Sequence, residues 1–199
     1  EITNAAFARA WAFIAARIKA SGSVQEQEVC DEILQHFEEH GATTYSPPIV
    51  GVNANGGNPH YATGTGARTT IREGDFVLVD LWARLKPAGS CYSDLTRTGY
   101  VGSEVPARFT QVFNIVAAAR DAGVACARDA FAAGRPVTGG EVDDAVRAVI
   151  EQAGYGQYFC HRTGHNLAQE VHGNGTHMDN LETCDSRRIL PGSMVNNVP

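Results

Sequence analysis

The 199-residue sequence has little of several features that mark specialised classes of protein. Basic residues are outnumbered by acidic ones, the net charge is −6, and no basic block is present. This balance excludes the electrostatic footprint of a nucleic-acid-binding protein. No apolar run approaches the roughly 20 residues of a membrane-spanning helix, and no signal-peptide pattern is present. We therefore expect neither nucleic acid nor a membrane as a partner.

Cysteine is scarce and shows no pairing pattern. The five cysteines are scattered, odd in number and without a C-x-x-C pair. This argues against a disulfide framework and a zinc ribbon, and predicts a reducing compartment, the cytoplasm. An initiating methionine is also lacking, because the chain begins at Glu1, which indicates a processed or excised piece.

What the chain does contain is typical of a globular protein, with 43% apolar and 19% charged residues. An apolar stripe predicts a helix over residues 5–20, and the capping-box spacing of Ser23 and Glu26 predicts the start of a second helix that ends at Gly41. Strand-like segments follow. GDFVLVDLWARL and CYSDLTRTGYVG, joined by the loop KPAGS, predict a β-hairpin.

The same order begins again at Pro106. A long helix is predicted to about Ala133, with Phe109, Val112 and Phe113 facing inward together with Val116, and a second helix over about 140–153. Strand-like segments follow from Tyr158. Two helices and then strands therefore occur twice, which predicts a duplicated α+β architecture, one domain over 1–199 with halves of about 1–103 and 104–199.

Two aspartates stand out near the predicted hairpin. Asp80 is the only charged residue in the apolar run FVLVDLWA, where an unpartnered carboxylate would cost on the order of several kcal/mol. Asp94 is placed to lie beside it on the return strand. Two adjacent carboxylates repel unless a cation holds both of them charged. The residues alone leave two interpretations open, a metal site and an ion pair of Asp80 or Asp94 with Arg97.

The segment HRTGHNLAQEVHG carries three of the seven histidines, His161, His165 and His172. Together with two aspartates, imidazole suits manganese, cobalt, zinc or iron better than a thiolate site would. Gly164 and Gly173 make a helix improbable, so different roles for His165 and His172 are more natural than two equivalent ligands.

These segments resemble the catalytic domain of the creatinase/aminopeptidase family of metallopeptidases, which has the pita-bread fold. Within that family the sequence is similar to the Xaa-Pro dipeptidase and Xaa-Pro aminopeptidase branch. The resemblance covers nearly the whole chain and rests on five motifs in order, namely IVGVNANGGNPHY, GDFVLVDLWA, YSDLTRTGYVG, HRTGHNLAQEVHGNG and LPGSMVNNVP. It implies two pseudo-symmetric halves around a central metal site, without the accessory N-terminal domain of the family.

The resemblance also implies a role for individual residues. Asp80 would chelate one metal ion, Asp94 would bridge two ions (Mn, Co or Zn), and His165 would be a further ligand. His172 would contact the substrate and stabilise the tetrahedral intermediate, and His60, in NPHY, would lie near the scissile peptide bond. His161 would lie in the substrate pocket, and Thr96 and Arg97 would orient Asp94. His36, His40 and His177 match no position of the family, and we expect them in solvent.

The implied activity is that of a metal-dependent exopeptidase, which cleaves peptides with proline in the second position through a metal-bound hydroxide. The partner is then a peptide, and a homodimer is a candidate assembly. Alternatives are a catalytically inactive relative that binds peptides or proteins, and a creatinase-type C–N hydrolase.

Several positions depart from the family pattern. Asp80 and Asp94 are further apart than usual, and Asn166 and Ala168 replace small residues, which predicts a tighter pocket. Val198 aligns with a ligand glutamate, and a second bridging glutamate has no counterpart, so we expect these residues alone to be inactive. If two ions were nevertheless held tightly, Glu170 or Glu182 would be the candidate replacements.

Overall fold

The computed structural model describes residues 1–199, which divide into two compact units, Glu1–Val105 and Pro106–Pro199. The boundary lies two residues beyond the 103/104 division expected from the repeated pattern. Each unit begins with two helices. No helix combines the length and the apolar character that a membrane crossing requires.

The first unit opens with α1 (Ile2–Ser21) and α2 (Glu26–Glu39), with the short strand β1 (Ser23–Gln25) between them. A capping box begins this helix, but two residues later than predicted. Gln25 is the N-cap and Glu28 is its partner, not Ser23 and Glu26. Because Glu26 is therefore the first helical residue, its side chain turns inward and is fully buried.

The strand β5 (Phe76–Leu85) is the centre of the sheet in the first unit. On one edge it pairs with β6 (Ser93–Tyr100), which confirms the predicted hairpin. On the other edge it pairs with β3 (Ile49–Val52) and, further along, with β2 (Ala42–Thr43). A separate small ladder joins β1 to β4 (Thr70–Arg72), and the 3-10 helix η1 (Asn53–Gly57) follows β3.

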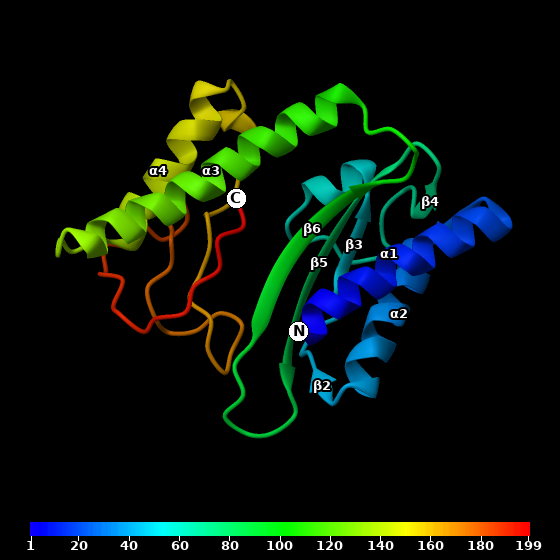
Figure 1. Ribbon diagram of the computed structural model, residues 1–199, viewed down its shortest axis with the longest axis horizontal. Coiled ribbons are helices and arrows are strands. Elements are labelled where there is room, and N and C mark those ends of the chain that lie inside the picture. The colour runs from blue at the N-terminus through cyan, green and yellow to red at the C-terminus, as the bar shows by residue number, and fades with distance from the viewer. The chain divides into compact units, whose positions relative to one another are not determined.

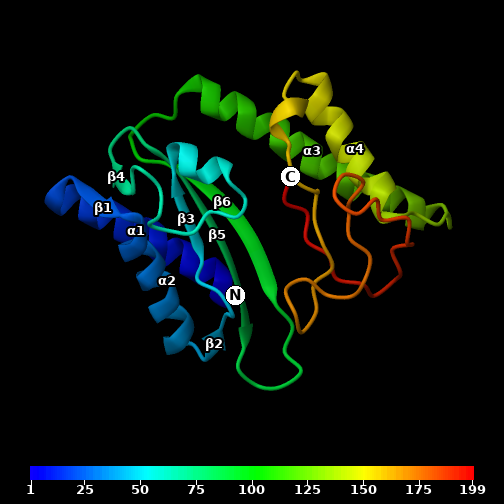
Figure 2. The same cartoon turned by 180° about the vertical axis from the view of Figure 1, so that it is seen from behind.

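The two faces of β5 differ, as the two-residue period of a strand requires. Val77, Val79 and Leu81 are fully buried and belong to the same core as Phe7 of α1 and Ile33 of α2. Figures 1 and 2 show both helices on this face of the sheet. The alternate residues, among them Asp80, therefore project from the opposite face.

The second unit begins with α3 (Ala107–Ala132) and α4 (Gly139–Gln152). These helices pack closely around Gly123, where a Cβ atom would lie 2.6 Å from Val146 Cγ2. The prediction that Phe113 faces inward is wrong, since it is 58% exposed. The core lies along the small residues of α3, such as Ala119 and Ala130, because only these permit the close approach to α4.

Regular strands were expected after α4, but beyond η2 (Gly156–Tyr158) the chain forms isolated bridges instead. Asn166 bridges Val195 and Gly164 bridges Met178, both antiparallel. The residues around His165 are thus extended, as predicted, without continuous ladders.

Buried aspartates take the place of those ladders. Asp143 accepts the backbone N–H groups of Thr163 and Asn180, each at 2.9 Å. Asp179 accepts from three successive residues, Leu181, Glu182 and Thr183. A buried N–H group needs a partner, and carboxylates supply it here where strand partners do not.

Candidate functional site

Asp80 and Asp94 lie on the same face of the β5–β6 pair. Asp80 is paired with Thr96, and Asp94 with Trp82. Directly opposed residues share a face and alternate residues return to it, so the two carboxylates are diagonal neighbours. This face of the sheet is the one that α1 and α2 do not cover.

Thr96 donates a hydrogen bond from Oγ1 to Asp80 Oδ1 at 2.8 Å. It was expected beside Asp94, so the structure moves its contact to the other aspartate. This bond orients the Asp80 carboxylate, and carboxylates that bind metals are commonly held in place by such a hydrogen bond.

Arg97 has a different place from the one expected. It is paired with Val79 and therefore projects from the helix-covered face. There it donates to Asn4 Oδ1 at 2.8 Å, and its guanidinium lies 4.8 Å from the centroid of the Phe7 ring. The sequence had left open an ion pair between Arg97 and one of the aspartates. The strand register excludes it, because Arg97 and both aspartates are on opposite faces.

His60 lies in the exposed loop that follows η1, with its backbone N–H bonded to Asn58 Oδ1 at 3.0 Å. The loop is fixed by the buried carboxylate of Glu26. Its oxygens accept from Val52 N at 2.7 Å, Asn55 Nδ2 at 2.8 Å and Tyr61 Oη at 2.6 Å. Burial and the bond to Glu26 raise the pKa of Tyr61, which keeps the phenol a donor.

In the second unit His165 is buried and contacts the side chain of Asn196. The backbone N–H of His165 donates to Asn196 Oδ1 at 2.7 Å, and Asn196 Nδ2 lies 2.9 Å from His165 Nε2. Because the amide nitrogen can only donate, Nε2 carries a lone pair, and Nδ1–H donates to the carbonyl of Asn166 at 3.3 Å. This tautomer is the one that a metal ligand needs at Nε2.

His165 belongs to a cluster of three imidazoles. The centroid of its ring lies 4.3 Å from that of His172 and 6.5 Å from that of His177, both edge-on. His177 was expected in solvent, but it is half-buried and its Nδ1 accepts from Asn166 N at 3.1 Å. Burial lowers the pKa of His177, with further lowering by Arg162 and Arg187, so this ring is neutral at pH 7.

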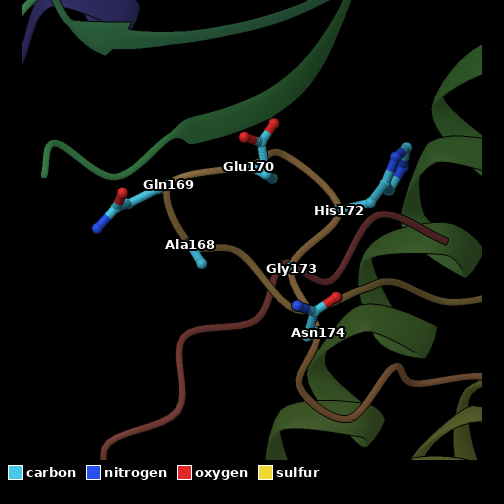
Figure 3. A pocket seen from close by; sticks show the side chains of 6 residues that line it. All are labelled: Ala168, Gln169, Glu170, His172, Gly173 and Asn174. Carbon is cyan, nitrogen blue, oxygen red and sulfur yellow. The ribbon is translucent and has the colours of Figure 1, made fainter. Parts of the chain in front are cut away.

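His172 also lines an open pocket of about 250 Å³ together with Ala168, Gln169, Glu170, Gly173 and Asn174. In Figure 3 this stretch of chain forms a rounded loop, and the side chains of Glu170 and His172 extend from its upper rim. The loop is shaped by Asn166, whose Oδ1 accepts from Gly175 N at 3.0 Å. A Cβ atom on Gly173 would lie 2.2 Å from that oxygen, so the glycines make room for the larger asparagine.

His161 is half-buried at the start of the same segment. Its ring packs edge-on against Phe159, with centroids 5.3 Å apart, and its Nδ1–H donates to the carbonyl of Arg162 at 2.8 Å. Arg147, paired with the buried Asp143 of α4, donates to the carbonyl of His161. The position of His161 is thus fixed through its backbone.

Asn196, His177 and Glu26 escaped the sequence interpretation, each for a physical reason. Asn196 lies 31 residues from its partner His165, so no local pattern joins them. His177 lies outside the histidine-rich segment, and the sequence pattern assigns Glu26 to a helix cap. Only for Glu26 did the sequence contain a warning. Gln25 and Glu28 have the same capping-box spacing as Ser23 and Glu26, and choosing them would have left Glu26 free for another role.

Comparison with known proteins identifies one family of peptidases. The model of metallopeptidase family M24 matches residues 1–199. The probable dipeptidase PepE of Mycobacterium tuberculosis is 36% identical over 148 residues, which are 74% of this chain and 36% of the relative. A putative Xaa-Pro aminopeptidase of Mycoplasma genitalium is 32% identical over 147 residues, 73% of this chain and 37% of that protein.

Solved structures that resemble this chain include peptidases of the same type. The prolidase of Thermococcus sibiricus superposes with a TM-score of 0.74 at 29% identity, over 98% of this chain and 47% of that one. The Xaa-Pro dipeptidase of Bacillus anthracis gives 0.75 at 30% identity, over 98% and 48%. The chain thus spans about half the length of these solved relatives and little more than a third of the curated ones.

The α+β fold is the pita-bread fold of the prolidases, and the chain belongs to metallopeptidase family M24, among proteins of the Xaa-Pro dipeptidase and aminopeptidase type.

Proposed function

We propose that this chain forms the metal-binding core of an exopeptidase that removes an N-terminal residue preceding proline. The observation that carries the proposal is the pair of aspartates on the sheet face opposite to α1 and α2, with Asp80 oriented by Thr96. The family match over the whole chain supports it. A cytoplasmic location is part of the proposal, and all five cysteines are free thiols.

The residues present suit divalent metal ions. Asp80 and Asp94 offer carboxylate oxygens, and His165 offers an imidazole whose Nε2 carries a lone pair. This mixed oxygen and nitrogen set suits manganese, cobalt or zinc, and manganese is our proposal. When bound, such ions would supply Lewis-acid stabilisation of the negative charge that develops on the scissile carbonyl.

The remaining histidines would act on the peptide. We assign His172, on the rim of the pocket, to donate a hydrogen bond to the substrate as its carbonyl oxygen gains charge. His60 would contact the peptide from its exposed loop. Asn196 would keep its bond to the backbone N–H of His165 when a metal ion binds. Its amide nitrogen would then move away from His165 Nε2, because the lone pair on Nε2 cannot serve the amide and the ion at once.

A second candidate function is peptide binding without hydrolysis. Val198 supports it, because the resemblance to the family aligns this residue with a ligand glutamate. The three ligands within these 199 residues would hold one ion weakly, and we expect these residues alone not to cleave peptides. A polypeptide that also carries the two family glutamates is the proper subject of the activity assay.

The test of the enzymatic proposal compares Asp94→Asn with His172→Ala in such a polypeptide. Asp94→Asn should remove bound manganese and the release of proline from an Xaa-Pro dipeptide together. His172→Ala should lower turnover by about 10²–10³-fold with manganese content unchanged, as expected for loss of one donor to the developing charge. Equal loss of metal in both variants would make His172 a ligand, and unchanged turnover in Asp94→Asn would end the proposal.

A further inference from the structure

The last turn of α2 brings together three potential ligands that the site above does not use. In the sequence HFEEH, ligand atoms of His36, Glu39 and His40 lie within 4.8 Å of one another. The two imidazoles are one helical turn apart, with ring centroids separated by 4.1 Å. This cluster is separate from Asp80 and Asp94, because α2 packs on the face of the sheet opposite to them.

The hydrogen bonds of both imidazoles leave one nitrogen of each with a lone pair. Nε2 of His36 lies 3.2 Å from the carbonyl of Ile2, and Nδ1 of His40 lies 2.8 Å from the carbonyl of His36. A carbonyl only accepts, so these nitrogens carry the protons. His36 Nδ1 and His40 Nε2 therefore hold the lone pairs. Metal-binding histidines are usually fixed in this manner, with the second nitrogen donating to a carbonyl.

The carboxylate of Glu39 is held beside the two imidazoles by hydrogen bonds from Arg9 and Gln35. Arg9 bonds Glu32 at 2.6 Å as well as Glu39, so it keeps a carboxylate partner when Glu39 turns toward an ion.

We propose that His36, Glu39 and His40 form a second, independent binding site for a borderline divalent cation, zinc in the first instance. Two imidazoles and one carboxylate with an open position are a typical zinc set. A tetrahedral ion about 2.0–2.1 Å from each ligand requires ligand atoms about 3.3 Å apart. The exposed side chains of His40 and Glu39 close the remaining distance by rotation. The ion would fix the end of α2 and, through His36, the Ile2 carbonyl at the start of α1.

The experiment uses all 199 residues, stripped with a chelator, with both family aspartates replaced (Asp80→Asn, Asp94→Asn) so that the carboxylate ligands of the first site are removed, and the new site is isolated by the difference between this background and its His40→Gln variant. Calorimetric titration with zinc chloride should give one ion per chain. His40→Gln on this background should weaken zinc binding by more than about tenfold. Removing a residue that only hydrogen-bonds to a metal ligand already lowers metal affinity by about 10–100-fold. Glu38→Gln, an exposed neighbour on the same turn, is the matched control and should bind zinc unchanged.

NMR spectra of the imidazoles provide a second measurement of zinc binding that does not depend on whether a variant folds. Zinc should move the imidazole NMR signals of His36 and His40 and leave those of His60 in place. No zinc uptake by the background protein, or equal uptake after His40→Gln, would overturn the proposal. Neither result bears on Asp80 and Asp94, because both are absent from this measurement.

Discussion

The hydroxyl of Thr96 orients the carboxylate of Asp80 through a hydrogen bond. It donates to one oxygen at 2.8 Å across the β5–β6 pair, while the backbone register places Asp94 two residues away on the same face. At the scale of single residues, the candidate centre thus depends on which face of β6 each side chain occupies.

Thr96→Val should therefore lower manganese affinity by about 10–100-fold, because the carboxylate loses the bond that orients it. Valine keeps the β-branched shape, so the urea midpoint should change little. Titration with manganese measures the effect, and Thr98→Val is the control, since Thr98 is on the same strand and face but opposite Leu78. Equal affinity in the two variants would mean that Thr96 does not position a ligand.

Asp185 supports a prediction about acid stability. Bonds from Arg187 and from the backbone N–H of His177 hold its pKa at about 2, against the opposing effect of burial. A carboxyl group with a lowered folded-state pKa stabilises the fold above its unfolded pKa of about 3.8 and loses this effect as the pH falls through about 2. The side chain is only 3% exposed, so the contribution near neutral pH is about 2 kcal/mol.

We expect Asp185→Asn to lower the free energy of unfolding by about 2 kcal/mol at pH 6 and by about half of that near pH 3. Urea titrations over this pH range measure it. Asp129→Asn is the control, because Asp129 is 69% exposed and pairs only with the equally exposed Arg128. A difference between the variants that stays constant down to pH 3 would contradict the assignment.

Among the elements of the chain, periodicity predicted the hairpin and the four long helices well, because burial of one face imposes a fixed period on each. The pairing of β5 with β6 and the position of Asp80 on the face opposite to the helices follow from that rule. The elements of the second unit were harder to predict. Asp143 satisfies the backbone N–H groups of Thr163 and Asn180, which lie 20 and 37 residues away along the chain, so no local pattern contains these bonds.

The loop that carries His60 depends on Glu26 in the same way. This carboxylate is fully buried and accepts from four donors, the fourth being Gly64 N at 3.2 Å. Glu26→Gln replaces one accepting oxygen by an NH₂ group that faces donors. Unfolding free energy should fall by roughly 3 kcal/mol, the range for unsatisfied buried groups.

Urea denaturation measures this loss, and amide exchange should rise over residues 53–66 before the rest of the unit. Glu38→Gln, 75% exposed at the other end of the same helix, should change stability by less than about 0.5 kcal/mol. If the two variants were equally stable, Glu26 would not be what fixes the loop.

For the whole molecule, the central prediction is that one divalent ion takes ligands from both units. Asp80 and Asp94 come from the first unit and His165 from the second. Ligands of one ion lie about 2.0–2.2 Å from it and hence about 3–5 Å from each other. A crystal structure of the chain with manganese should therefore place Asp80, Asp94 and His165 Nε2 around the same ion, with the Asn196 amide moved off Nε2.

Binding should also make the stability of the two units interdependent, since an ion that both units share stabilises each by RT ln(1 + [L]/Kd). With three protein ligands the affinity is expected to be weak, so manganese should raise the unfolding midpoint only at concentrations well above Kd. In this experiment His165→Ala should abolish the rise in the first unit, which does not contain the histidine. A rise that persists in the first unit of that variant would show the aspartates binding manganese without the second unit, and a single shared centre would then be wrong.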